Sequence, residues 1–475
     1  MNDKVNEVLK FIDRNIDSHI EKLRDLVKQP SVSVNSYGTK KCAGMIQDWM
    51  RELGFQRVHL YAEDVNPIVF GEFRPSNPEN KKTLMLYGAY DSNPVEETDW
   101  SYPPYQAVSI EKPKIGTCLV GRGANNKMKV SGIMNAIDSV ARVHGDLPLN
   151  LLVVFDGEEE MFSPHLSDFI SANREWLNQA DALYMPFSSQ NAQGVARVQL
   201  GYKGILYLEL EASGKIWGRG PSDHEIHSMH RPVVENPIWH LINALVSMTG
   251  KDGNNVVIEG FSNEIEPRPK DFLKVMQNLA ENFDLNAYTK GLGVRNLLSD
   301  INTPLEALEI LFSTSQINID GIWGGYTGPG PEAVIPSNAK AKIEVRLIPN
   351  QKAERIYDLI RQHLIKHGFS DIKVQKLAAV DYCHTGIESD IAQALIRSYE
   401  LNNIKYQVWP SSLATIPISL FNQPPLELPF STGCVGFGGH SHGPNEFAVI
   451  KGKYPISGLA EYEKVISALI YEYSR

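Results

Sequence analysis

The sequence is poor in cysteine, in long apolar runs and in excess basic charge, and each shortage excludes a class of protein. It contains only 4 cysteines in 475 residues, with no C-x-x-C pair, which is too few for a disulfide framework. No stretch approaches the roughly 18 apolar residues of a membrane-spanning helix. The charged N-terminal segment lacks the apolar core of a signal peptide. The sequence therefore predicts a cytoplasmic protein without a membrane partner.

Basic residues are outnumbered by acidic ones. Lys+Arg 46 against Asp+Glu 56 gives a formal net charge of −10, and the pI is near 5.8. Nucleic-acid-binding domains normally carry a basic patch, so no nucleic acid is expected as a partner. With 42% hydrophobic and 21% charged residues, the composition is typical of a globular protein. At roughly 100–200 residues per domain, the length predicts two or three domains.

Two patterns of apolar residues divide the chain. Helical spacing over residues 3–28 and 131–143 alternates with buried apolar runs at 84–88 and 149–157. Strand, helix and strand at this spacing predict a mainly parallel sheet covered by helices. After about residue 200 the strands alternate in polarity instead, which predicts an antiparallel sheet with helices on one face.

Short buried strands return near residue 380, so the second pattern interrupts the first. The predicted fold class is α/β: a mixed, mainly parallel catalytic domain with an inserted α+β domain. The expected boundaries are 1–202 for the first part of the catalytic domain, 203–380 for the inserted domain, and 381–475 for the second part.

An acidic triplet is the first candidate for a site. Glu158, Glu159 and Glu160 directly follow the predicted strand at 149–157, and open α/β sheets bind ligands beyond the carboxyl ends of their strands. One carboxylate could bind a metal ion while its neighbour acts as a general base. A solvated acidic turn is the alternative.

Two clusters of histidine are further candidates, since imidazole is a standard zinc ligand. His440 and His442 lie in the glycine-rich segment GGHSHGPNE at 438–446. DHEIHSMH at 223–230 contains three more histidines, two of which would share a face if the segment were helical. Surface histidines are the alternative for both clusters.

Six segments, in order, resemble the dinuclear zinc peptidases and deacylases. This family includes carnosine-type dipeptidases, aminoacylases, acetylornithine deacetylase and bacterial glutamate carboxypeptidase. The segments are LMLYGAYDSNPVEETDW (84–100), GRGANNKMKVSG (121–132), FDGEEEMFS (155–163), DHEIHS (223–228), the long segment at 318–351, and HGPNE (442–446). The first three are similar to the family's H-x-D-x-x-P, G-R-G-x-x-D-x-K-G and E-G-x-E-E-x-G-S, and the last to its H-x-x-N-E. The resemblance implies an inserted domain that usually forms a homodimer.

The resemblance also implies roles for individual residues. Glu159 falls on the general base, and Asp91 on the acid that supports a metal-binding histidine. Glu160 and His442 fall on two ligands of the second zinc ion. Three further matches are expected to contact substrate: Asn126 and the inserted-domain residues His227 and Arg346. His227 is also expected to be catalytic.

Three expected metal ligands are replaced. Ala89 stands where the family has histidine, Asn126 where it has the bridging aspartate, and the third acid should lie near Phe187, where no Asp or Glu occurs between 182 and 207. Alanine has no donor atom, and a neutral amide is a poorer zinc ligand than a carboxylate. The resemblance therefore implies at most one zinc or other divalent ion, at Glu160 and His442, or none. Three changes, one to a bulky aromatic residue, favour natural divergence over engineered inactivation.

Three functions remain open. The first is an amidohydrolase of the dipeptidase or N-acyl amino-acid hydrolase type with an altered, at most mononuclear centre. The second is a metal-independent enzyme that uses Glu159 as acid or base for acyl transfer, isomerisation or elimination. The third is a non-catalytic protein that binds a peptide or a partner. Five residues of the family pattern are retained, which favours an enzyme acting on a small peptide-like or N-acyl amino-acid substrate: Glu159, Glu160, His227, Arg346 and His442.

Overall fold

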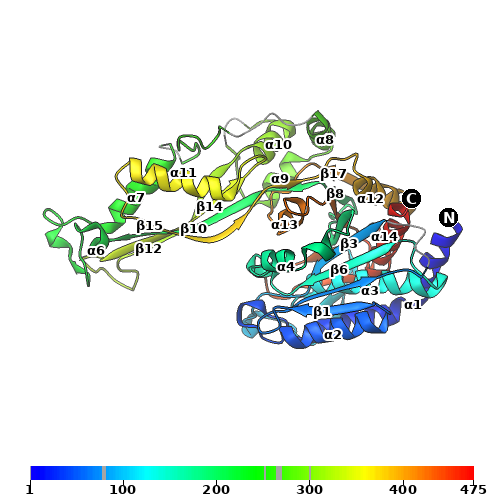
Figure 1. Ribbon diagram of the computed structural model, residues 1–475. Helices are drawn as coiled ribbons and strands as arrows, with labels where there is room; N and C mark the ends of the chain where they lie inside the picture. The colour runs from blue at the N-terminus through cyan, green and yellow to red at the C-terminus, as the bar shows by residue number, and fades with distance from the viewer. Residues whose placement is uncertain (1, 77–81, 251–252, 264–269, 299–300) are drawn as a thin grey trace. The chain divides into compact units, whose positions relative to one another are not determined.

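A computed structural model describes residues 2–76, 82–250, 253–263, 270–298 and 301–475 (Figure 1). The chain forms two compact units. Unit 1 consists of Met1–Gly201, His384–Ser411 and Leu420–Arg475, and unit 2 of Tyr202–Cys383 and Ser412–Ser419. No helix among the described residues is both long and apolar enough to cross a bilayer.

The main sheet of unit 1 is mixed, with a largely parallel centre. Strands β6, β3, β7 and β18 run parallel to one another, and β8 runs parallel to β17. The pairs β1–β2, β2–β6 and β18–β8 are antiparallel. In spatial order the strands are β1 (Arg57–Tyr61), β2 (Ile68–Phe73), β6 (Asn150–Asp156), β3 (Thr83–Ala89), β7 (Ala182–Ser188), β18 (Phe430–Cys434), β8 (Ala196–Gln199) and β17 (Tyr406–Trp409). This confirms the predicted α/β class.

Helices cover both faces of this sheet. The larger apolar core lies under α1 (Asn2–Lys28), α2 (Thr39–Glu52), α3 (Ala124–His144), α12 (Asp390–Leu401) and α14 (Leu459–Tyr473). On the other face the Phe70 ring meets that of Phe169, with centroids 5.0 Å apart, in α4 (Leu166–Ala172), and α5 (Arg174–Leu177) follows. The helix expected over 3–28 is confirmed: its apolar stripe is buried because its period matches one helical face.

A second, antiparallel sheet of unit 1 carries two of the segments that resemble the peptidase family. Its order is β19 (Gly438–Gly439), β20 (Phe447–Gly452), β5 (Gly116–Val120) and β4 (Val108–Lys112). Strand β5 leads into the GRGANN segment, and the HGPNE segment leads into β20. Since β5 and β20 are hydrogen-bonded neighbours, these two segments lie side by side.

Unit 2 is built on a four-stranded antiparallel sheet in the order β12 (Gln316–Gly324), β14 (Asn338–Leu347), β10 (Gly204–Ser213) and β15 (Lys373–Val380). Burial alternates along β10 and β14, and the buried face packs under α7 (Pro237–Met248) and α11 (Ala353–Lys366) (Figure 1). The predicted antiparallel sheet with helices on one face is confirmed. The shorter elements of this unit include α6 (Gly214–Trp217), α8 (Lys270–Ala280), α9 (Leu285–Gly291), α10 (Pro304–Ser313), β11 (Ile226–His227) and β13 (Val334–Ile335).

Residues 412–419 group with unit 2, whereas the sequence placed them within the second part of the catalytic domain. Their contacts explain the difference. Ser412 bridges Tyr202, and the Thr415 hydroxyl donates to the Lys203 carbonyl at 2.7 Å.

A buried polar cluster ties together the helices of unit 1. His19 Nδ1 of α1 lies 2.6 Å from Glu463 Oε2 of α14, and Asn135 Nδ2 of α3 donates to Glu463 Oε1 at 2.8 Å. The Glu463 side chain is fully buried. A buried carboxylate that loses a partner keeps its desolvation cost, so all three helices depend on this cluster.

Replacing His19→Ala should lower the free energy of unfolding by about 3 kcal/mol, because Glu463 would stay buried without its imidazole partner. The matched control is Lys451→Ala, which removes an exposed ion pair with Asp17 of the same helix and should change it by less than about 1 kcal/mol. Urea unfolding of both variants measures the difference. Equal effects would contradict the role given to the buried cluster.

Candidate active site

The candidate site lies at the carboxyl edge of the main sheet of unit 1. Parallel strands β3 and β6 end in register, with Ala89 beside Asp156, and β7 ends at Ser188 next to β3. The Tyr90 amide donates to the Asp156 carbonyl at 3.0 Å, just beyond the paired residues. The segments after β3 and β6 therefore leave the sheet side by side, as the sequence predicts for a ligand site.

The three consecutive glutamates have different environments. Glu158 is buried and accepts hydrogen bonds from Asn66 Nδ2 at 3.2 Å and His165 Nδ1 at 2.7 Å. It is therefore a structural residue that fixes the turn. Glu159 is half-buried, and its carboxylate forms no hydrogen bond or ion pair with any part of the chain that the structure describes.

Glu160 is the centre of a hydrogen-bonded cluster. Its Oε1 accepts from Asn126 Nδ2 at 3.0 Å, its Oε2 accepts from Asn93 Nδ2 at 2.7 Å, and His442 Nε2 lies 3.0 Å from Oε2. Its backbone amide donates to Asp91 Oδ2 at 3.1 Å. The structure thus brings together four residues predicted from the sequence, Asp91, Asn126, Glu160 and His442.

A buried carboxylate holds the two loops of this cluster together. Glu446 accepts from the amides of Gly123 at 3.0 Å and Asn125 at 3.2 Å, and from Arg122 Nη1 at 3.1 Å. Gly123 has a φ of +79° at the start of α3, a conformation that costs glycine least. Because Glu446 belongs to the HGPNE segment, these bonds keep His442 near the N-terminal end of α3.

Crowded carboxylates shape the electrostatics. Burial raises the pKa of Asp91 well above 3.8, and the nearby charges of Glu159 and Asp156 raise it further. Burial and Glu159 also raise the pKa of Glu160, while His442 and Lys129 lower it. Asp91 Oδ1 is buried and has no hydrogen-bond partner among the described residues. The cluster therefore gains from a nearby positive charge.

The described residues include no group of three His, Cys, Asp or Glu side chains arranged to hold a metal ion. Ala89 places a fully buried methyl group at the end of β3, and Phe187 is half-buried at the end of β7. The remaining candidate ligands, Glu160 Oε2 and His442 Nε2, stand 3.0 Å apart. Two ligands of one tetrahedral zinc ion would stand about 3.3 Å apart, so this pair fits one ion in spacing but supplies only half of a usual ligand set.

The amide of Asn126 offers its nitrogen, not its oxygen, to Glu160. Nδ2 donates to the Asp91 carbonyl and to Glu160 Oε1, both at 3.0 Å, and Oδ1 accepts from Lys129 Nζ at 2.8 Å. Turning the amide over would set donor against donor and acceptor against acceptor in all three contacts. In this arrangement Asn126 has no lone pair directed at a metal ion beside Glu160, so a two-zinc centre does not fit these residues.

His227 and Arg346, the two site residues predicted outside the catalytic domain, lie in unit 2. His227 is exposed, and its Nδ1 accepts from the Met229 amide at 3.1 Å, which leaves Nε2 as the ring donor. The segment around it is not helical: a short strand, Ile226–His227, is followed by a 3-10 turn, Ser228–His230. Arg346 forms a two-point contact with Glu344, at 3.1 and 2.9 Å, and donates to Thr415 Oγ1 at 3.2 Å.

Three side chains at the site were not predicted from the sequence: Lys129, Asn93 and Phe162. In the GRGANNKMK segment Lys129 falls on the last glycine of the family's G-R-G-x-x-D-x-K-G, and Phe162 falls on the glycine of E-G-x-E-E-x-G-S. Phe162 keeps the backbone that a glycine would favour, with a φ of +62°, and the residue is 44% exposed. These departures from the family motifs were the available signals. For Asn93 no such signal existed.

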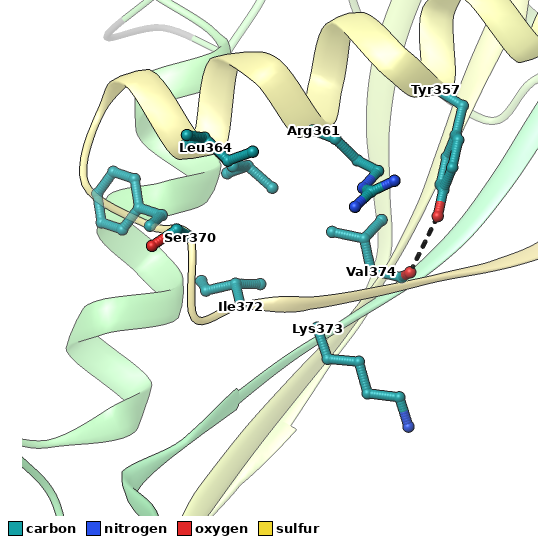
Figure 2. Close-up of a pocket in the computed structure, with 9 residues that line it drawn as sticks. Tyr357, Arg361, Leu364, Ser370, Ile372, Lys373 and Val374 are labelled. Atoms are coloured by element: carbon teal, nitrogen blue, oxygen red, sulfur yellow. Dashed lines mark hydrogen bonds between the residues drawn. The ribbon is translucent and has the colours of Figure 1, made fainter. Parts of the chain in front are cut away.

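A separate pocket of about 350 Å³ lies in unit 2 between α11 and β15, and contains none of the predicted site residues (Figure 2). Leu364 and Ile372 form its apolar part, while Arg361 and Lys373 contribute positive charge. The Tyr357 hydroxyl donates to the Val374 carbonyl at 3.3 Å on one side. This pocket is therefore distinct from the candidate site at the β3 and β6 edge.

Comparisons with known proteins show a similarity to metal-dependent peptidases. A family profile for the M20 peptidase dimerisation domain matches residues 204–371. The Cys-Gly metallodipeptidase of Schizosaccharomyces pombe is 25% identical over 403 residues, which cover 81% of this chain and 79% of that protein. The beta-Ala-His dipeptidase of Rattus norvegicus is 24% identical over 379 residues, covering 76% and 73%.

Solved structures agree. An M20 family metallo-carboxypeptidase from Sulfolobus solfataricus superposes with a TM-score of 0.83 at 27% identity, covering 96% of this chain and 98% of that one. A dipeptidase from Saccharomyces cerevisiae has a TM-score of 0.81 at 20% identity, covering 100% and 99%, and shows the same fold. These matches confirm the resemblance found in the sequence: the chain is similar to M20 metallopeptidases over most of its length, and residues 204–371 match their dimerisation domain.

Asp156 provides a pH-dependent test of how deeply this edge of the sheet is buried. Burial raises its pKa from 3.8 to about 6, although Ser163, Tyr87 and the Glu158 amide all donate to it. Well below the unfolded pKa of 3.8 the carboxyl is protonated in both states. As pH rises from 4 to 6 the unfolded chain ionises first, so this contribution to stability is lost through the folded pKa, by about 3 kcal/mol.

Asp156→Asn removes this titration. The free energy of unfolding of the wild type should therefore fall relative to the variant between about pH 4 and 6, as measured by urea unfolding at several pH values. Parallel pH profiles for the two proteins would show that Asp156 does not have a raised pKa in the folded state.

Proposed function

We propose that this protein is an amidohydrolase of the dipeptidase or N-acyl amino-acid hydrolase type, with an altered centre that holds at most one metal ion. The observation that carries the proposal is the Glu159 carboxylate. It is half-buried, has no partner among the described residues, and adjoins the Glu160 cluster. Such a carboxylate gains no stabilising contact from the fold. A general base needs a lone pair that is free to accept a proton, and Glu159 has one.

In this proposal Glu159 takes a proton from a water molecule, and the water oxygen forms a bond to the carbonyl carbon of the substrate. The bond between that carbon and the amide nitrogen then breaks, and Glu159 gives its proton to the leaving amine. Glu159 lies close enough to Glu160 and Asp91 for its negative charge to raise the pKa of both. Water supplies all the atoms added to the products.

Glu160 and His442 are the residues that would hold an ion if one entered this site, where it would polarise the substrate carbonyl; the charge of the neighbouring Lys129 opposes such an ion. Every other contact in the proposal comes from the chain itself. Asn93 and Asn126 orient the Glu160 carboxylate, and Glu446 holds the loop of His442. The resemblance also gives His227 of unit 2 a substrate contact, and its Nε2 is the ring donor available for it.

The substrate class is inferred from the relatives and from Arg346. The relatives are named for Cys-Gly and beta-Ala-His, both dipeptides with a free carboxylate. A guanidinium binds a carboxylate through two parallel hydrogen bonds, which is how Arg346 binds Glu344. A substrate carboxylate would have to replace Glu344 in this contact. Met161 and Phe162, which follow Glu159 closely in the sequence, have exposed apolar side chains. These side chains favour apolar groups on the substrate.

A metal-independent reaction is the second candidate, and the observation that favours it is Lys129. Its ammonium group supplies a positive charge near Glu160 without any ion. Glu159 would have the same role as acceptor of a proton in either case.

Glu159→Gln should lower kcat for a dipeptide such as Cys-Gly or beta-Ala-His by about 10²- to 10⁴-fold with little change in KM, because the amide cannot accept the proton. The measurement is steady-state hydrolysis in the presence and absence of zinc or manganese. Asp168→Asn, which changes an exposed acid on nearby α4, is the matched control and should leave turnover unchanged. Full activity in Glu159→Gln would contradict the proposal.

We also propose that the protein is a homodimer formed through unit 2. Exposed apolar side chains gather on α7 and on edge strand β12: Trp239 is 56% exposed, Ile319 48% and Trp323 42%. Strand β12 is hydrogen-bonded on one side only, and an apolar edge strand left open promotes association. The family match over 204–371 to a dimerisation domain supports the same surface.

The homodimer should have a mass of about twice 53.1 kDa in light scattering coupled to gel filtration. The double variant Ile319→Glu, Trp323→Glu should be monomeric at the same concentration, because like charges would face each other across the edge. Leu377→Glu is the control, an equally exposed position on the opposite edge strand β15. Dissociation of the control but not of the β12 variant would contradict the assigned surface.

A further inference from the structure

Lys129 occupies a position in the site that its helix and its neighbours define. It lies three residues after Asn126 in α3, and side chains at this spacing share one face of a helix. It is half-buried, and its Nζ donates to Asn126 Oδ1 at 2.8 Å. The family motif has glycine here, so the ammonium group is a feature of this chain and not of the fold.

The contact fixes the chemistry of the neighbouring amide. With Oδ1 bound to the ammonium group, the nitrogen of Asn126 faces Glu160 Oε1 and the Asp91 carbonyl. The oxygen that a metal ion would need is thus turned toward Lys129. Lys129 and Asn126 together oppose an ion, one by its charge and the other by the orientation of its amide.

The same ammonium group meets the electrostatic need of the cluster. Asp91, Glu159 and Glu160 place three carboxylates close together, and Asp91 Oδ1 is buried without a partner among the described residues. A lysine carries three N–H donors, and the structure shows one of them used, on Asn126. The other donors can reach an oxygen of a bound molecule.

We infer that Lys129 takes the place of the metal ion as the positive charge of this site, keeps zinc from binding between Glu160 and His442, and offers its remaining donors to a carbonyl or carboxylate oxygen of the ligand. The identity of the ligand rests on the proposed function. The exclusion of zinc does not, because it depends only on the residues of the site.

The test is zinc content, measured by mass spectrometry on protein incubated with zinc and then desalted. The wild type should retain less than about 0.2 ion per chain at this site. The double variant Asn126→Asp, Lys129→Ala should retain about one, with an affinity about 100-fold or more higher in competition with a fluorescent chelator, since it gains a carboxylate and loses the ammonium group. Adding His442→Ala to the double variant should abolish the gain.

Controls separate this result from misfolding and from the question of activity. Lys451→Ala, which removes an exposed lysine elsewhere, should bind no more zinc than the wild type. If the double variant does not fold, Asn126→Asp with Lys129→Gln tests the same point, because glutamine keeps a long polar side chain without its charge. Stoichiometric zinc in the wild type that His442→Ala removes, or a folded double variant that binds no more zinc than the wild type, would overturn the inference.

The ligand part is tested separately with glycylglycine as the probe. Lys129→Met should weaken its binding, followed by calorimetry, by about 10-fold or more, and Lys129→Arg should recover part of it. Equal affinities for the wild type and Lys129→Met would overturn this part of the inference. A wild type that hydrolyses no dipeptide would count against the proposed function and leave the zinc result standing.

Discussion

The site depends on the hydrogen bond between Asn126 Nδ2 and Glu160 Oε1. This contact joins the start of α3 to the turn that follows β6. It therefore links two of the segments that resemble the family motifs, GRGANNKMKVSG and FDGEEEMFS. A bridging aspartate in place of Asn126 would repel Glu160 unless a cation stood between them. The amide removes that need, so two loops that would otherwise require an ion are held by hydrogen bonds alone.

The neighbouring contacts are consistent with this bond. Asn93 and His442 approach the other oxygen of Glu160, and Lys129 holds the amide oxygen of Asn126. Glu446 fixes the loop of His442 from behind. Of the carboxylates Asp91, Glu159 and Glu160, Glu159 alone forms no hydrogen bond or ion pair with the part of the chain that the structure describes, and the proposed chemistry therefore centres on it.

Much of the fold could be predicted from the sequence, because the spacing of apolar residues in a long segment indicates whether it is a helix or a strand. The helical stripe of α1 and the alternating strands of unit 2 were both recognisable from spacing. The position of 412–419 was not, since it depends on contacts of Ser412 and Thr415 with residues far away in sequence.

The candidate site was predictable where a residue keeps the type that the family motif requires. Glu159, Glu160 and His442 belong to this group, whereas Lys129 and Phe162 are visible only as side chains at two family glycines. What the sequence could not give was geometry. Which atom of the Asn126 amide faces Glu160, and whether the Glu159 carboxylate forms a hydrogen bond, depend on three-dimensional contacts. These contacts decide what the site can bind.

The most direct measurement is X-ray diffraction at the zinc absorption edge from crystals soaked in zinc. We expect no anomalous peak between Glu160 and His442, with Lys129 Nζ bound to Asn126 Oδ1. A strong peak held by Glu160 and His442, or two peaks about 3.5–4 Å apart, would contradict it.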